Sequence, residues 1–278
     1  MKAGVALPSL IPETYGAHLL DWAVAAEQLG FDSAAVLNGS LRRGFDPVVT
    51  LAAVGAATRR PRLIGGVLAE QPGTSMAEFG RQLGCVDEIS GTRLTVALAP
   101  RGARALAELD RATGALRDAW ASSSLYVASD RPDGPDLLLR GDMSGLAGLV
   151  ARRATGWMGG GVSLDTYRRT AEQLDTAWAS EARDGRPYIV GVRLFSFGSD
   201  ADETADRHIS HRYGTAESAR EYRHAVLTHP DQVPDALAAM DDAGVDELVF
   251  APCSTAISHL ELLASAVLPR TRAMAVSA

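Results

Sequence analysis

The sequence predicts an α/β protein folded as a (β/α)8 TIM barrel. Short apolar runs rich in Val, Ile and Leu alternate with longer amphipathic stretches about eight times along the chain. A strand followed by a helix, repeated in this way, is typical of a parallel sheet with crossover helices. The number of repeats and the length of 278 residues favour a closed barrel over an open, doubly wound sheet. We therefore expect one barrel domain over residues 1–278.

The predicted strands are short and rich in β-branched and leucine side chains. They are expected at Lys2–Leu7, Ser33–Leu37, Arg62–Leu68, Arg93–Leu98, Asp136–Leu139, around Trp157, at Tyr188–Ser196 and at Glu247–Ala251. The first segment superficially resembles a signal peptide. Its apolar stretch ends at Pro8-Ser9 without a cleavage site, so we interpret it as a strand.

The predicted helices carry start and stop signals. One helix ends at Gly30, and another begins after Asp46 with Pro47 at its first position. The helices are expected at Tyr15–Leu29, Pro47–Thr58, Met76–Ile89, Ala103–Trp120, Leu146–Ala154, Leu164–Arg183, Ala201–Tyr213, Pro230–Ala243 and Ala256–Val267. Residues 121–135 interrupt the alternation with turn-forming sequence, and we expect a short surface hairpin there.

Composition excludes several classes of protein. The net charge of −7 disfavours general nucleic-acid binding. No apolar run approaches the ~20 residues that cross a bilayer. Cys85 and Cys253 stand far apart, which excludes a disulfide framework and a finger-type zinc site and fits a reducing, cytoplasmic location. We expect the partners to be a small-molecule substrate and a second copy of the chain.

Two glycine-containing loops are candidates for binding an anion. Gly159-Gly160-Gly161 follows the sixth predicted strand, and Arg140–Ser144 follows the fifth. Backbone amides at a helix start bind phosphate, Arg140 can pair with it, and Ser144 can cap the next helix. Neighbouring loops on one rim of a barrel favour a shared site. The alternatives are ordinary loops and an arginine that is solvated or paired with Asp142.

His208 and His211 stand three apart on a predicted helix. This spacing can place two imidazoles on one face. No matching carboxylate ligand is identifiable on a second element, so a solvated face is favoured over a metal site. We expect no metal.

Several segments resemble the bacterial-luciferase-like monooxygenase family, which includes enzymes that use flavins or coenzyme F420. The similar segments are Glu27–Ser33, Asp46–Thr58, Arg62–Val67, Gln82–Leu94, Ala151–Trp157 and Ala243–Leu248. They occur in the family's order and cover most of the chain except about residues 99–135. The resemblance implies a (β/α)8 barrel and a non-covalently bound coenzyme F420 or FMN across its C-terminal mouth.

The resemblance also implies which residues form the site. Residues bordering the cofactor ring would be Asn38, Gly65, Gly66 and Val67, with a non-proline cis peptide next to Gly66. Phosphate would lie on Arg140, Gly141, Ser144, Gly159 and Gly160. Ser9, Arg101 and Arg193 could line the substrate side, because each lies near the C-terminal end of a predicted strand or in the barrel interior. Asn38 and Arg101 are the candidate catalytic residues.

The chain departs from the family on the rim where chemistry is expected. Asn38-Gly39 stands where many members have an acidic residue and histidine, and glycine cannot transfer protons. Ala97, Ala99 and Arg101 replace alternating glycines, and Glu70–Gly73 replaces an Arg-His-Pro turn.

The first hypothesis is therefore a flavin- or F420-dependent oxidoreductase or monooxygenase that acts on a small organic substrate. The alternatives are a non-catalytic homologue, such as a structural subunit of a heteromeric pair, and a cofactor-free lyase or isomerase with Asp142 or Glu70 as base. The resemblance implies a homodimer through the second and third helices, which often form the interface in this family. The helix after Asp46 has little polar cover, which favours a partner on its outer face. Burial under the chain's own loops is the other explanation.

Overall fold

The computed structural model describes residues 1–12, 14–37, 45–69, 73–101, 105–122, 131, 133–141, 145–160, 163–214 and 217–276. The strands are β1 (Lys2–Ala6), β2 (Ser33–Leu37), β3 (Arg62–Leu68), β4 (Leu94–Ala99), β5 (Asp136–Leu139), β6 (Gly156–Met158), β7 (Tyr188–Phe195) and β8 (Glu247–Pro252). The helices are α1 (Gly16–Leu29), α2 (Pro47–Ala57), α3 (Met76–Ser90), α4 (Ala105–Ala121), α5 (Leu146–Arg153), α6 (Leu164–Ser180), α7 (Ala201–Tyr213), α8 (Glu217–His224), the 3-10 turn η1 (Pro230–Gln232), α9 (Val233–Asp242) and α10 (Ile257–Val276). Within these ranges no helix is both long and apolar enough to cross a membrane.

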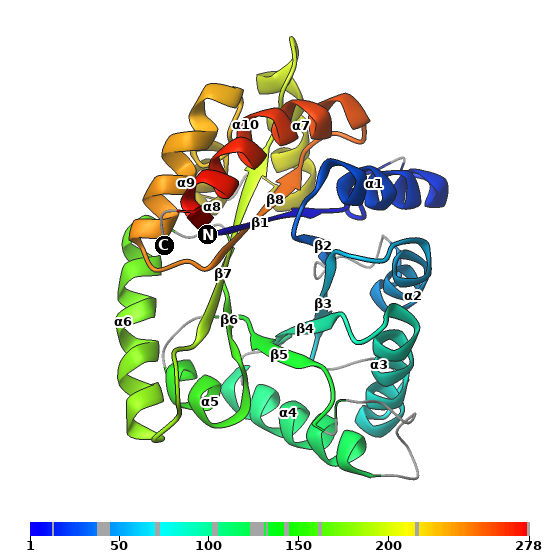
Figure 1. Cartoon of the computed structure of the whole chain (residues 1–278), viewed down its shortest axis with the longest axis vertical. Helices are drawn as coiled ribbons and strands as arrows, with labels where there is room; N and C mark the ends of the chain where they lie inside the picture. The colour runs from blue at the N-terminus through cyan, green and yellow to red at the C-terminus, as the bar shows by residue number, and fades with distance from the viewer. Residues whose placement is uncertain are drawn as a thin grey trace.

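The eight strands close into a parallel barrel in the order β1 to β8, and β8 pairs back onto β1. Figure 1 shows the helices placed around the outside of this ring, with α2 and α3 side by side. The predicted (β/α)8 class is confirmed. The strands predicted with boundaries begin and end within one residue of those positions, and β6 lies around Trp157 as expected.

Three helical segments differ from the prediction. The stretch expected at Pro230–Ala243 divides into η1 and α9, because Pro234 lacks an N–H and is suited only to a helix start. Helix α8 is an addition, since its strongly polar sequence offers only two apolar side chains, Ala219 and Tyr222, as a signal. Helix α10 runs on to Val276. The hairpin expected at 121–135 lies mostly outside the described residues.

Buried side chains form one layer inside the barrel and another between the strands and the helices. The inner layer holds mostly small and aliphatic residues: Ala6, Ala35, Leu37, Ile64, Ala97, Leu138, Met158, Val190, Val249 and Ala251. The outer layer includes Trp22, Leu51, Phe79 and Tyr167. Because successive strand residues point to opposite faces, this division shows which side chains point into the barrel.

Two segments share the pattern glycine–apolar–aspartate, Gly30-Phe31-Asp32 and Gly244-Val245-Asp246, and each forms the turn that leads from a helix into a strand. Gly30 and Gly244 end or follow their helices with positive φ angles of 100° and 83°. Asp32 Oδ2 then accepts the N–H of Ala3 at 2.8 Å, and Asp246 Oδ2 accepts that of Ile189 at 2.7 Å. Each carboxylate thereby ties its own strand to the preceding strand of the barrel.

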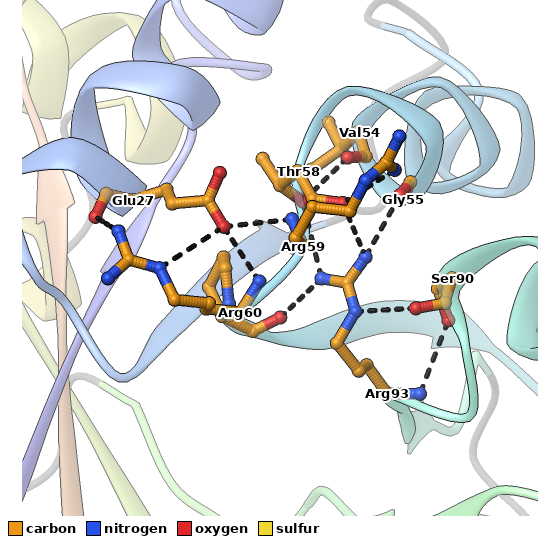
Figure 2. Close-up of polar contacts among 9 residues, drawn as sticks. Glu27, Val54, Gly55, Thr58, Arg59, Arg60, Ser90 and Arg93 are labelled. Carbon is orange, nitrogen blue, oxygen red and sulfur yellow. Dashed lines mark hydrogen bonds and ion pairs between the residues drawn. The ribbon is translucent and has the colours of Figure 1, made fainter.

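An arginine network holds the N-terminal side of the barrel together (Figure 2). Arg93, just before β4, donates to the carbonyl oxygens of Gly55 and Thr58 at 2.9 Å each and of Pro61 at 2.7 Å. Glu27 of α1 accepts the backbone N–H groups of the two residues that follow Thr58, at 2.8 and 2.7 Å. The end of α2 is thus bound to α1 and to the start of β4.

Glu247 is fully buried where β8 begins. It pairs with Arg62 of β3, accepts a hydrogen bond from Ser33 of β2, and accepts another from Tyr188 of β7 at 2.8 Å. This cluster closes the N-terminal end of the barrel. The strands' other end is left for the candidate site.

Candidate functional site

Two cavities open at the C-terminal ends of the strands. The larger, here called the outer cavity, has a volume of about 1360 Å³ and lies between the ends of β4, β5 and β6 and helix α6. The smaller, the inner cavity, has a volume of about 160 Å³ and lies at the ends of β1, β2, β7 and β8, under α7 and α8. Arg140 and Gly160 line both cavities. The two cavities therefore meet at these residues.

The loop after β5 contributes Arg140 and Gly141. Arg140 is fixed by its backbone N–H, which donates to the carbonyl oxygen of Leu98 at 2.9 Å. Burial, and then the guanidinium of Arg212, lower the pKa of Arg140. An anion placed beside Arg140 would relieve this repulsion between cations.

The loop after β6 contributes Gly159 and Gly160. A Cβ atom on Gly159 would come within 2.3 Å of the Trp157 ring, so the ring itself requires glycine there. A Cβ atom on Gly160 would meet Val192 only at 3.6 Å, an ordinary contact. The space beside Gly160 is therefore part of the cavities and is not filled by a neighbouring side chain.

Both loops lead into helices. Ser163 caps α6, as its hydroxyl accepts the N–H of Thr166 at 3.3 Å, and the predicted helix start is confirmed. Helix α5 is preceded by Gly145 as its N-cap, which corrects the assignment of Ser144 to that position. Gly145 has a φ angle of 76°, a conformation that glycine adopts without strain. Ser144 and Gly161 lie outside the described residues.

Arg193 of β7, which the sequence analysis places on the substrate side, lines the inner cavity. Several other residues of this cavity were not predicted from the sequence. The missed residues are His208, Arg212 and Tyr213 of α7 and Tyr222 of α8. His208 is only 7% exposed, so the expectation of a solvated histidine face is wrong for this residue. A usable signal was the four-residue spacing of His208 and Arg212, which places them on one helix face.

The two glycines of β3, Gly65 and Gly66, face opposite sides of the barrel wall. Gly65 faces the helices, since a Cβ atom there would lie 2.6 Å from Leu51 of α2. Val67 belongs to the same outer layer. Gly66 pairs in register with Leu37 and Ala97, both of the inner layer, and faces into the barrel. Gly65 and Val67 can therefore offer a bound ring only backbone atoms.

The expected cis peptide next to Gly66 is corrected by the structure. All peptide bonds of the described residues are trans, including those from Gly65 to Val67. β3 stays in register with both neighbouring strands through these residues, and the trans backbone continues both ladders.

Neither Ser9 nor Arg101 lines either cavity. Ser9 is buried, and its hydroxyl donates to the carbonyl oxygen of Leu37 at 3.4 Å, between the ends of β1 and β2. The Arg101 side chain is exposed, and its backbone N–H donates to Glu108 at 2.8 Å. Three further candidates, Asn38, Glu70 and Asp142, lie outside the described residues.

The inner cavity combines positive charge with apolar walls. Arg140, Arg193 and Arg212 line it together with Leu7, Leu10 and Leu37, and its described lining contains no aspartate or glutamate. Burial, helped by Arg212 and His211, lowers the pKa of His208 to about 4, so this imidazole is neutral at neutral pH. Such an arrangement can bind a small anion and exclude water from its apolar part.

Comparison with known proteins relates the first part of the chain to a family. Residues 1–119 match the family model described as luciferase-like monooxygenase, which confirms the resemblance seen in the sequence. The two similar segments after residue 150 lie beyond the matched range. Curated protein sequences give no significant match.

Solved structures share the fold at low sequence identity. Monooxygenase RslO1 from Streptomyces bottropensis has a TM-score of 0.79 at 20% identity, over 98% of this chain and 100% of that one. An F420-dependent secondary alcohol dehydrogenase in complex with an F420-acetone adduct has a TM-score of 0.78 at 14% identity, over 96% and 98%. EDTA monooxygenase from Chelativorans sp. BNC1 has a TM-score of 0.73 at 14% identity, over 99% and 94%. At these identities the likeness shows a common fold.

Proposed function

We propose that this protein is an oxidoreductase that uses coenzyme F420 or FMN to transform a small organic substrate. The observation that carries the proposal is the pair of cavities that meet at Arg140 and Gly160. A cofactor in the outer cavity would there adjoin a substrate in the inner one. The family match over residues 1–119, and neighbours named as monooxygenases and as an F420-dependent dehydrogenase, support this class of reaction.

The residues of the outer cavity fit a phosphate-bearing cofactor. Its volume of about 1360 Å³ exceeds the ~300–1,000 Å³ of most ligand pockets and accommodates a tricyclic ring with a tail. Arg140 supplies a cation at the shared border, which is the place where the two cavities meet at Arg140 and Gly160. Gly141 and Gly160 allow a phosphate to approach the backbone closely. These residues would hold the phosphate. The cofactor, when bound, supplies the hydride or oxygen chemistry.

The chain's own contribution is binding, orientation and exclusion of water. Leu7, Leu37 and Ala251 form an apolar wall at the ends of β1, β2 and β8, on the inner side of the border. Low-dielectric walls of this kind strengthen the attraction between the arginines and a bound anion. A substrate held there is kept next to the shared border, where the two ligands would meet.

Titration of the purified protein with FMN and with coenzyme F420, oxidised and reduced, tests the proposal by fluorescence. We expect saturable binding of one cofactor, weakened at least tenfold in Gly160→Leu, because leucine fills the shared border. Gly114→Leu in α4 is the matched control, since a Cβ atom there meets nothing within 4 Å and Gly114 lines neither cavity. Absence of binding by either cofactor would refute the proposal.

We also propose a homodimer that uses α2 and α3. The outward face of α2 consists of Val49, Ala53, Ala56 and Ala57, all exposed and without charge. Val49 is 69% exposed, and Ile89 on the adjacent α3 is 52% exposed. Apolar surface of this kind on a helix favours contact with a partner over contact with water.

A further inference from the structure

The inner cavity concentrates cations from separate elements of the barrel. Arg140 follows β5, Arg193 lies on β7 and Arg212 lies on α7. Arg212 is near enough to Arg140 to lower its pKa. Burying like charges together is unfavourable unless a counter-charge is brought to them.

No counter-charge for them is present in the part of the chain that the structure describes. None of the three guanidinium groups forms an ion pair with a described carboxylate. Arg193 Nε and Arg212 Nη1 are buried and have no hydrogen-bond partner among the described residues. The other contacts are modest: Arg193 Nη1 donates to the Ala225 carbonyl oxygen at 3.5 Å, and Arg212 Nε donates to the Tyr213 hydroxyl at 3.0 Å.

Unused buried donors indicate what the cavity binds. A buried N–H of a charged group without a partner costs more than an ordinary unmade hydrogen bond. An oxyanion accepts hydrogen bonds from several guanidinium groups at once. Neutral ligands such as simple alcohols or ketones offer no charge to balance the cluster.

The size and walls of the cavity set limits on the rest of the ligand. A volume of about 160 Å³ is below the usual range for drug-sized ligands, so the ligand is small. Leu10, Ile11 and Val192 add apolar surface to the lining. An anionic head with a short apolar body matches both features.

We propose that the inner cavity binds a small organic anion, a carboxylate or sulfonate with a short apolar chain, and that Arg193 and Arg212 receive its oxyanion. As a statement of substrate class, this rests on the proposed oxidoreductase function. Arg193 and Arg212 line only the inner cavity, whereas Arg140 lines both. The first two are therefore assigned to the substrate, and Arg140 stands between substrate and cofactor.

The test measures binding to the protein without any added cofactor, by calorimetry and by the shift in melting temperature. The probes are butanoate and butane-1-sulfonate, with 1-butanol and butylamine as neutral and cationic counterparts of the same chain length. We expect at least one of the two anions to bind and the other two probes not to bind. Equal binding of 1-butanol, or no binding of either anion, would overturn the proposal without recourse to any variant.

Variants then locate the site. Arg193→Gln and Arg212→Gln should each weaken anion binding at least tenfold, and Arg193→Lys should retain part of it because the charge remains. Arg111→Gln, at an exposed arginine of α4, is the matched control and should bind as the unchanged protein does. Unaltered anion binding in both inner-cavity glutamine variants would place the anion elsewhere and refute the assignment.

Titration of the same variants with FMN and coenzyme F420 separates this proposal from the proposed function. We expect cofactor affinity to change less than threefold in Arg193→Gln. A large loss there would mean that Arg193 serves the cofactor phosphate, and the substrate assignment would fall. Anion binding without any cofactor binding would instead support the anion site in the inner cavity and refute the proposed oxidoreductase function.

Discussion

The Tyr188 hydroxyl donates a hydrogen bond to Glu247 Oε2 at 2.8 Å, which joins the neighbouring strands β7 and β8. Glu247 also pairs with Arg62 and is fully buried. We expect Glu247→Ala to lower the free energy of unfolding by about 3–5 kcal/mol, since it leaves a guanidinium without its partner. Urea unfolding measures this loss. The double variant Arg62→Met/Glu247→Met should recover part of the stability, and a double variant no better than Glu247→Ala would contradict the reason given.

Arg93 should be a second centre of stability on that side of the barrel. Arg93→Ala removes donors to the carbonyl oxygens of Gly55 and Thr58, both labelled in Figure 2, and to that of Pro61. We expect a loss of about 2–4 kcal/mol in urea unfolding, because buried acceptors are left unpaired. Arg60→Ala is the control. Its side chain is 74% exposed, and a loss as large as that of Arg93→Ala would argue against the network.

Gly156 should tolerate no side chain. A Cβ atom there would lie 1.8 Å from the carbonyl oxygen of Tyr188, a backbone atom of the adjacent strand. Gly156→Ala should therefore destabilise the protein by about 3 kcal/mol or more, or prevent folding. Gly160→Ala, four residues further on, should change the melting temperature little, because its nearest contact is 3.6 Å away. Similar melting temperatures for the two variants would show that β6 and β7 are not packed as described.

His208 should make stability depend on pH. Burial lowers its pKa in the folded protein to about 4, below the ordinary value of 6.5. Between these values the unfolded chain binds more protons, so the free energy of unfolding falls as the pH is lowered. From pH 7.5 to 5.0 the expected contribution of His208 is about 2 kcal/mol. Urea unfolding of His208→Gln should show a flatter pH profile, whereas the exposed His224→Gln should keep the original slope.

The proposed dimer predicts a change in mass on substitution of α2. Light scattering coupled to size exclusion should give the mass of two chains for the unchanged protein and of one chain for Val49→Asp, because a carboxylate would be buried at the contact. Leu262→Asp on α10, at a side chain 41% exposed, should remain dimeric. A monomeric unchanged protein would remove this proposal.

The fold was predictable because its signals are local. Glycine–apolar–aspartate turns, the Asp46 cap and short apolar runs each specify one element, and the barrel follows from their order. Helix α8 escaped prediction because it is short and strongly polar, with only Ala219 and Tyr222 as apolar side chains. Asn38 and Ser144, which the sequence assigns to the rim, lie outside the described residues.

The candidate site was less predictable because it depends on which face a side chain occupies. Arg140 and Gly160 follow strands, so their place at the mouth could be inferred from position alone. Arg212 lies on a polar helix, where its four-residue spacing from His208 places the two on one face but does not show that this face lines a cavity. Gly65 and Val67 occupy a predicted strand but point outward, since alternation assigns them to the helical layer.

Arg140 lines both cavities, so the binding of a ligand in one cavity affects the binding of a ligand in the other. One guanidinium cannot give its full attraction to two anions at the same time, so each occupant alters the free energy with which the other binds. Thermodynamics then requires the effect to be mutual: the factor by which the first ligand changes the second ligand's affinity is the factor it experiences in return. The affinity of each cavity for its ligand would thus depend in part on a single side chain that both cavities share.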